Sequence, residues 1–155
     1  MYSLNNMITD GSVQLGVSAE NWEEAIRIGG SLLKKNGFIT QQYIDAMVDT
    51  CKELGPYIVI APGLAMPHSA PEKGVIKPAV SLITLSQPVE FGNKDHDPVS
   101  VVFCIAATKD HDQLVAALTQ ITGIASNSNT FNKLIVANSL EDVKSIIDDL
   151  ENSFI

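Results

Sequence analysis

The first third of the chain has apolar positions that recur with the period of an amphipathic helix. One stretch begins after Asn21, a favourable N-cap, with Glu24 at the capping-box position three residues later. A second stretch begins after Thr40 and ends before Gly55. Two helices are therefore predicted. Their buried faces would consist of Trp22, Ala25, Ile26, Gly29, Leu32 and Leu33 in the first and Ile44, Met47, Val48, Cys51 and Leu54 in the second.

The period then changes, and three shorter apolar runs indicate strands. Residues 57–60 are short, β-branched and bounded by Pro56 and Pro62. Residues 79–85 and 99–107 are almost continuously apolar. A strand that faces water on one side alternates between apolar and polar residues, so these two runs favour a sheet that is covered on both faces.

The last third of the chain returns to helical spacing. Asp110 is a suitable cap for a third helix, with Leu114, Leu118 and Ile121 facing inward. Residues 131–136 form a short helical candidate. Ser139 with Asp142 would cap a last helix that buries Val143, Ile146, Ile147 and Leu150. We therefore expect one α/β domain over residues 1–155, a three-layer α/β/α sandwich whose mixed sheet is covered by helices on both faces.

The charge of the chain argues against nucleic acid as a partner. There are 18 acidic residues against 10 basic ones, for a net charge of −8. A nucleic-acid binder needs a basic stripe that displaces counterions from phosphates, and the chain has only an isolated Lys34–Lys35 pair. No apolar run is long enough to span a membrane, and residues 1–16 do not resemble a signal peptide. We therefore expect a cytoplasmic protein.

The segment from Ala61 to Glu72 is the strongest candidate for chemistry. It contains three prolines and a glycine, so we expect a rigid loop rather than a helix or a central strand. It follows a buried strand, and ligands in open α/β sheets commonly bind at the C-terminal ends of strands. His68 comes directly after Pro67 in this loop. A neutral imidazole is available near pH 7 and can attack a phosphoryl donor without a separate base.

The hexapeptide Gly63-Leu64-Ala65-Met66-Pro67-His68 resembles the motif of the mannitol/fructose superfamily of enzyme IIA domains of the bacterial phosphotransferase system. Residues 98–107, followed by His111 and Leu114, are similar to that superfamily's strand and second histidine. The likeness extends from about residue 20 to residue 147. Residues 55–62 resemble the ascorbate-type branch more than the mannitol or fructose branch.

The resemblance implies a phosphotransferase that works through a phosphohistidine and needs no organic cofactor or metal. His68 would be the nucleophile that becomes the tele-phosphohistidine, and His111 would bind the phosphoryl oxygens or orient the ring. The donor would be the histidine-containing phosphocarrier protein and the acceptor a cysteine of a IIB component, which in turn serves a IIC membrane transporter. L-Ascorbate is the favoured sugar, with galactitol, mannitol and fructose left open. A homodimer is also compatible with the sequence.

The chain departs from the pattern of these relatives in two places. Ascorbate-type members often follow the active histidine with Ala-Arg-Pro, whereas this chain has Ser69-Ala70-Pro71. Mannitol-type members carry an arginine upstream, where this chain offers Lys52. The basic group that would neutralise a phosphoryl charge is therefore not identified by the sequence.

Other functions have less support. The three histidines show no metal-ligand spacing, and the strand at 99–107 would separate His96 from His111 by roughly 25 to 30 Å. Ser69 lacks the elbow motif of a hydrolase nucleophile. Cys51 and Cys104 lie within apolar patterns, as buried residues do, which argues against a IIB role. A regulatory IIA-like protein that is not coupled to transport is the alternative left open. Leu64 and Met66 would belong either to an apolar docking patch or to the core.

Overall fold

The helices and strands follow the predicted order, with additions at the N-terminus and in the middle of the chain. The structure is a computed structural model that describes residues 3–109 and 111–152. Its helices are α1 (Leu4–Met7), α2 (Trp22–Lys35), α3 (Gln41–Leu54), α4 (His111–Ser126), α5 (Ser128–Val136) and α6 (Leu140–Asn152), with short 3-10 turns η1 (Asp10–Ser12) and η2 (Pro71–Lys73). Its strands are β1 (Val13–Val17), β2 (Val59–Ala61), β3 (Leu64–Ala65), β4 (Ala79–Val89) and β5 (Val99–Ala106).

The five strands form one mixed sheet in the order β1-β4-β5-β3-β2. The long central strands β4 and β5 are antiparallel, with Ala79 opposite Ala106. β1 runs parallel to β4, and β3 runs parallel to β5. β2 and β3 form a short antiparallel hairpin at one edge. The predicted mixed sheet is confirmed.

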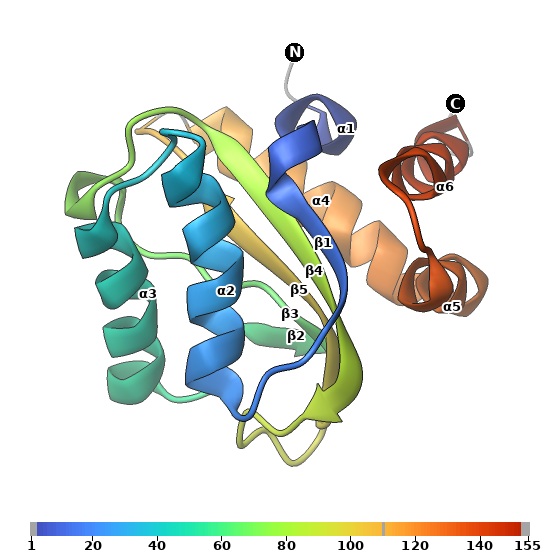
Figure 1. Ribbon diagram of the computed structural model, residues 1–155, viewed down its shortest axis with the longest axis horizontal. Helices are drawn as coiled ribbons and strands as arrows, with labels where there is room; N and C mark the ends of the chain where they lie inside the picture. Colours follow the sequence, from blue (N-terminus) through green and yellow to red (C-terminus); the bar gives the residue numbers. More distant parts are fainter. Residues whose placement is uncertain (1–2, 110, 153–155) are drawn as a thin grey trace.

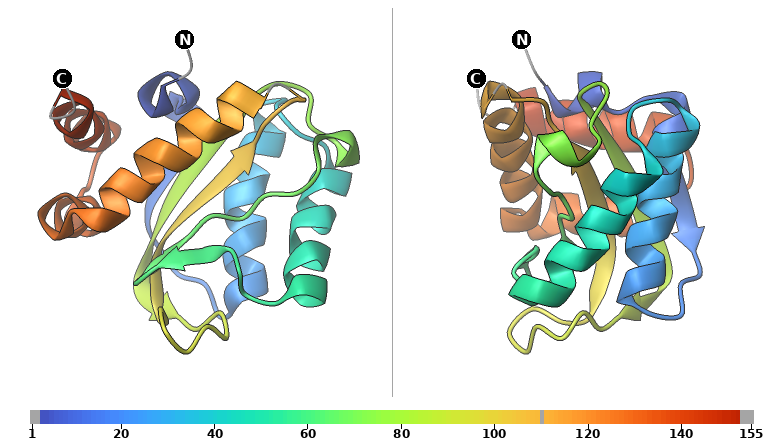
Figure 2. Two further views of the ribbon diagram at one scale, coloured as in Figure 1. Left: turned by 180° about the vertical axis from the view of Figure 1, so that it is seen from behind. Right: turned by 90° about the vertical axis from the view of Figure 1, so that its left-hand side faces the viewer.

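Helices cover both faces of this sheet. Figures 1 and 2 show α2 and α3 on one face and α4, with α5 and α6, on the other. β5 supplies both interfaces in turn: Val102 and Cys104 belong to the core under α2 and α3, whereas Val101, Phe103 and Ile105 belong to the core under α4. This alternation explains why the strand is apolar at nearly every position. The predicted α/β/α sandwich is therefore confirmed.

Three predicted helix starts are confirmed by their caps. The Asn21 side chain accepts a hydrogen bond from the Glu24 amide at 2.9 Å, and Thr40 is the N-cap of α3. The Ser139 hydroxyl accepts from the Asp142 amide at 3.1 Å. Each bond satisfies an N–H group that the first helical turn leaves without a partner. The fourth predicted cap, Asp110, lies outside the described residues.

The sheet differs from the prediction in its smaller strands. The sequence does not predict β1, because the strand has only five residues and includes Gly16, a residue type that is unfavourable in strands. β2 begins two residues later than expected. β3 lies inside the segment predicted to be an irregular loop, and that prediction was wrong at Leu64 and Ala65. The prolines of this segment lie outside Leu64 and Ala65, so both residues have the N–H groups that pairing in a sheet requires.

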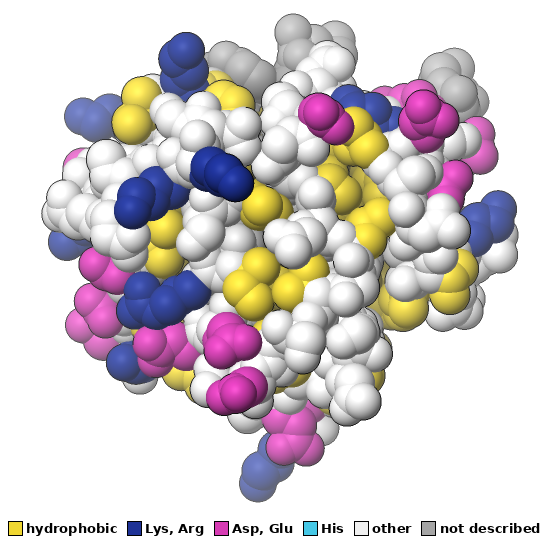
Figure 3. All heavy atoms as spheres, viewed as in Figure 1, with side chains coloured by type: hydrophobic (Ala, Val, Ile, Leu, Met, Phe, Trp, Pro, Cys, Tyr) yellow, Lys and Arg dark blue, Asp and Glu magenta, His cyan; other side chains and the backbone are white. Residues whose placement is uncertain are grey.

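Both cysteines are buried free thiols, as predicted. Complete burial raises the pKa of the Cys104 thiol to about 12. Neither cysteine is therefore suited to act as a nucleophile. Within the described part of the chain, no helix is long and apolar enough to cross a membrane. On the face shown in Figure 3, basic and acidic side chains are interspersed over α2 and α3.

Close approach of α2 to β5 requires a glycine at position 29. A Cβ atom added there would lie 2.7 Å from the Cys104 Sγ atom. We expect Gly29→Ala to lower the free energy of unfolding by about 1 kcal/mol, because overpacking costs about 1–3 kcal/mol and the gain in helix propensity is at most about 1 kcal/mol. Urea denaturation measures the change.

The matched background for this test is Cys104→Ala, which removes the sulfur atom that the new methyl group would meet. In that background the Gly29→Ala substitution should be neutral or stabilising. An equal loss of stability in both backgrounds would show that the contact with Cys104 does not determine the requirement for glycine.

Candidate functional site

His68 lies just after β3, in a segment that is fixed on both sides of the histidine. Before it, the Met66 amide donates to the Ile58 carbonyl at 2.8 Å. The Pro67 carbonyl accepts from the Ile105 amide on β5 at 2.9 Å. After it, the Ser69 amide donates to the Tyr43 hydroxyl at 3.0 Å. The backbone of His68 is therefore tied to the sheet and to α3.

Tyr43 on α3 connects the end of β5 to the His68 loop. Its side chain is completely buried, and its hydroxyl donates to the Ile105 carbonyl at 2.7 Å while it accepts from the Ser69 amide. Burial raises the pKa of Tyr43, so the group stays a neutral hydroxyl that can donate and accept at once. The same atom therefore holds the end of β5 and the residue after His68.

The His68 ring has a defined orientation. Its Nδ1 atom lies 2.8 Å from the Met66 carbonyl oxygen. Because a carbonyl can only accept, Nδ1 carries a proton, and in the neutral ring Nε2 keeps the lone pair. The Tyr57 ring stands edge-on to the imidazole, with ring centroids 5.9 Å apart and planes 79° apart. The half-buried histidine therefore has Nε2 as its available nucleophilic atom.

A cavity of about 340 Å³ opens beside this ring. The end of β5 and the start of α4 form its far wall, as the positions of Ile105 and Leu114 show. The residues that line the cavity are Tyr43, His68, Ser69, Pro71, Glu72, Ile105, Ala107, Thr108, Lys109 and Leu114. α4 begins at this wall, and the positive end of a helix dipole favours an anion.

The connection from β5 to α4 is held by a buried amide side chain. The Gln113 oxygen accepts from the Thr108 amide at 2.9 Å and from the Thr108 hydroxyl at 2.8 Å. Gln113 is only 4 % exposed. This wall of the cavity is therefore an ordered turn, although it contains no regular secondary structure.

The other two histidines lie in different parts of the fold. α4 begins at His111, and the neighbouring residues Lys109 and Leu114 line the cavity with His68. The His111 side chain lies outside the described residues, so its contact with His68 stays a prediction. His96 lies near the opposite end of β5, where its carbonyl accepts from the Gly63 amide at 2.9 Å. The length of β5 places it roughly 25 Å from the cavity.

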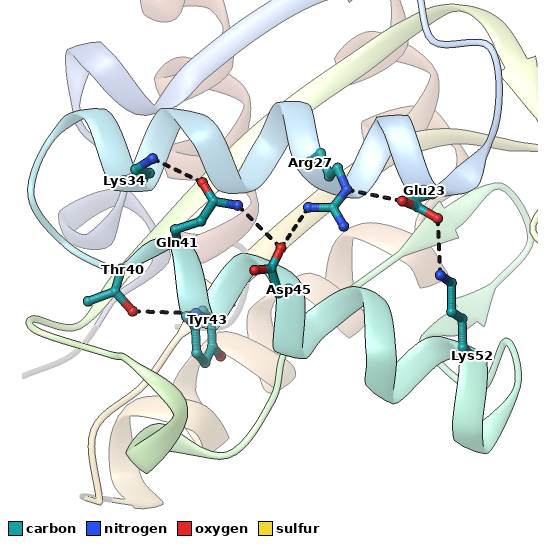
Figure 4. Close-up of polar contacts among 8 residues, drawn as sticks. All are labelled: Glu23, Arg27, Lys34, Thr40, Gln41, Tyr43, Asp45 and Lys52. Carbon is teal, nitrogen blue, oxygen red and sulfur yellow. Dashed lines mark hydrogen bonds and ion pairs between the residues drawn. The ribbon is translucent and has the colours of Figure 1, made fainter.

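Lys52 belongs to a network of charges between α2 and α3. Its ammonium lies 3.5 Å from the Glu23 carboxylate, which also pairs with Arg27 at 3.1 Å. Arg27 in turn reaches Asp45 at 2.9 Å (Figure 4). The Arg27 hydrogen bond is the main cause that lowers the pKa of Glu23. Lys52 therefore pairs two helices and does not line the His68 cavity.

The remaining sequence candidates belong to the interior. Leu64 and Met66 are 0 % and 1 % exposed and pack in the core under α4, so neither forms a docking patch. Within residues 3–109 and 111–152, no three His, Cys, Asp or Glu side chains come together as a group that could hold a metal ion.

Two site residues were missed by sequence reasoning. Tyr43 lies on the buried face of α3, where an aromatic residue indicates only core packing. Gln113 is the third residue after the expected cap Asp110, and this capping-box position could have marked it as a helix-start acceptor.

Removal of the Tyr43 hydroxyl tests how the loop is held. Tyr43→Phe leaves the Ile105 carbonyl and the Ser69 amide without this partner, so we expect a loss of about 1–3 kcal/mol in the free energy of unfolding. Hydrogen exchange at the Ser69 amide should also accelerate. Tyr57→Phe is the control, because Tyr57 is 44 % exposed and should change stability by less than about 0.5 kcal/mol. Equal effects of the two substitutions would contradict this role.

Comparison with known proteins agrees with this geometry. Residues 6–150 match the family model described as "Phosphoenolpyruvate-dependent sugar phosphotransferase system, EIIA 2". The chain is 36 % identical over 144 residues to the ascorbate-specific PTS system EIIA component of Escherichia coli K12, which covers 93 % of this chain and 94 % of the relative.

Solved structures show the same similarity. The crystal structure of the PtxA protein of Streptococcus mutans has a TM-score of 0.88 at 30 % identity and covers 99 % of this chain and 97 % of its own. The mannitol enzyme IIA of E. coli, solved in complex with phosphorylated enzyme IIB, has a TM-score of 0.79 at 27 % identity, covering 92 % and 97 %. The chain belongs to the EIIA type 2 family of the phosphoenolpyruvate-dependent sugar phosphotransferase system, whose members are phosphoryl carriers.

Proposed function

We propose that this IIA protein carries its phosphoryl group on the Nε2 atom of His68, in an ascorbate-type transport system. The observation that carries the proposal is the hydrogen bond between Nδ1 and the Met66 carbonyl. It fixes the tautomer that leaves Nε2 free beside the cavity at the start of α4. The nucleophile, its orientation and a place for an anion therefore occur together.

The transfer would require little covalent help from other residues. The Nε2 lone pair attacks phosphorus, and the bond from phosphorus to the donor nitrogen breaks with its electron pair returning to the donor ring. His68 keeps its Nδ1 proton, so its ring takes up the positive charge that the donor ring gives up. The Met66 carbonyl then accepts a charge-assisted hydrogen bond, which is stronger than the neutral one.

Positioning is the main contribution expected of the protein. Tyr43 and Ile105 hold the backbone on either side of His68, so the imidazole does not need to be ordered at the moment of transfer. The first N–H groups of α4 would receive the phosphoryl oxygens, together with His111.

The partners follow from the phosphoryl relay. The donor would be the histidine-containing phosphocarrier protein, and the acceptor a cysteine of a IIB component that serves a IIC transporter. Support for a IIB acceptor comes from the similar mannitol IIA, which was solved with phosphorylated IIB. Support for ascorbate as the sugar comes from the relative named as ascorbate-specific, at 36 % identity over nearly its whole length.

Intact-mass measurement tests the nucleophile. After incubation with phosphoenolpyruvate, enzyme I and the phosphocarrier protein, the wild type should gain one acid-labile phosphoryl group. His68→Ala should gain none, because the attacking nitrogen is lost, while its fold should be kept. His96→Ala is the matched control and should be phosphorylated normally, since His96 lies near the other end of β5. Phosphorylation of His68→Ala would contradict the assignment.

The same reaction separates transport from regulation. When the IIB component of an ascorbate-type system is added, the phosphorylated protein should lose its extra mass and the IIB cysteine should gain it. Phosphorylation by the donor without transfer to this IIB component would favour the regulatory alternative.

His111 is tested by the rate of the same reaction. We expect His111→Ala to slow phosphorylation by about ten- to hundredfold, because one donor to the phosphoryl oxygens would be lost, with acceptance by His68 still detectable. Quenched-flow sampling followed by mass measurement gives the rate. A rate equal to that of the wild type would remove His111 from the site.

A further inference from the structure

A phosphoryl group on His68 would bring negative charge into the cavity, and the imidazole alone would not neutralise it. A phosphoryl group adds about −1.5 to −2 charges near pH 7. The chain already has a net charge of −8, and the Glu72 carboxylate belongs to a residue that lines the same cavity. Backbone N–H groups contribute only partial charges. A full positive charge near the cavity would therefore stabilise the phosphorylated state.

Lys52 and Lys73, which lie on either side of His68 along the chain, do not line this cavity. Lys52 pairs with Glu23 on α2. Lys73 lines a different cavity, on the α3 side of Ser69, together with Asp45, Asp49 and Glu53. Its ammonium therefore belongs to a residue of a neighbouring cavity that three carboxylates also line.

Lys109 is the one cationic residue among the described residues that line the His68 cavity. It is exposed, and no ion pair within the described part of the chain occupies it. Its backbone follows Thr108, which Gln113 holds in place through two hydrogen bonds. The anchor is therefore rigid, whereas the four-carbon side chain is free to turn its ammonium toward an anion.

We propose that Lys109 binds the phosphoryl oxygens of phosphorylated His68 and supplies the positive charge that Lys52 does not provide. The proposal rests on the assignment of His68 as the phosphorylated residue. It places the cation after β5, at the start of α4, instead of on α3. Lys109 is thus a binding residue for the transferred group, in a cavity that Glu72 also lines.

A chemical donor tests this role without any partner protein. Phosphoramidate transfers its phosphoryl group to histidine: Nε2 attacks phosphorus, the phosphorus–nitrogen bond breaks, and the amine leaves as ammonia. We expect Lys109→Gln to slow phosphorylation of His68 about tenfold, the lower end of the value of a hydrogen bond to a charged group. Lys109→Arg should stay within about threefold of the wild type, because it keeps the charge.

Two further variants separate a local charge from a structural effect. Lys133→Gln makes the same change in net charge on α5, in a cavity formed with α6, and should leave the rate unchanged. Glu72→Gln removes the opposing charge and should increase the rate. Added salt should reduce the difference between Lys109→Gln and the wild type.

Titration with inorganic phosphate gives a measurement that does not depend on transfer. The His68 ring signals, followed by NMR, should respond to phosphate with about tenfold weaker affinity in Lys109→Gln than in Lys133→Gln. Equal phosphate affinities and equal phosphoramidate rates in these two variants would overturn the role of Lys109. If instead the wild type accepts nothing from the phosphocarrier protein, the proposed function fails, and the phosphate titration still decides whether Lys109 binds the anion.

Discussion

Burial of β5 on both faces is the constraint on which the rest of the structure depends. Its side chains alternate between the core under α2 and α3 and the core under α4, so both helical layers are positioned by one strand. Because both faces of β5 are covered, water does not reach its backbone. The N–H and C=O groups on both edges therefore bond to neighbouring strands. β4 occupies one edge, and the short β3 occupies the other, which brings the segment that contains His68 alongside the end of β5.

The site is an extension of this arrangement. Ile105 uses its amide to hold Pro67 and its carbonyl to accept from Tyr43, so the last part of β5 fixes both the loop and the helix that packs over it. The Tyr43 hydroxyl also accepts a hydrogen bond from the Ser69 amide in the loop. Buried hydrogen bonds of this kind are costly to leave unmade, so they stabilise the observed position of the loop. The nucleophile that we propose would receive a group from one protein and pass it to another, and such fixed geometry would favour both steps.

The basic residue that lines the His68 cavity is not the one that the sequence pattern indicates. Lys52 lies at a helix position where it would be expected near the site, yet it pairs with Glu23 across two helices. The network of Arg27, Glu23 and Asp45 uses these charges for the packing of α2 on α3 (Figure 4). The cavity wall after β5 contributes Lys109 instead, from a segment without regular secondary structure.

The sequence by itself determined the longer elements and the two-faced sheet, and it singled out His68 as a candidate, because helical periodicity, unbroken apolar runs and a Pro-His loop are local signals. Only the tertiary structure decided that residues 13–17 add a parallel strand and that Leu64 and Ala65 enter the sheet, since strand pairing depends on partners far along the chain. The same holds for the site. The Tyr43 hydroxyl acquires its role from contacts over long sequence distances, and the role proposed for Lys109 depends on the shape of the cavity. No spacing pattern encodes either of these.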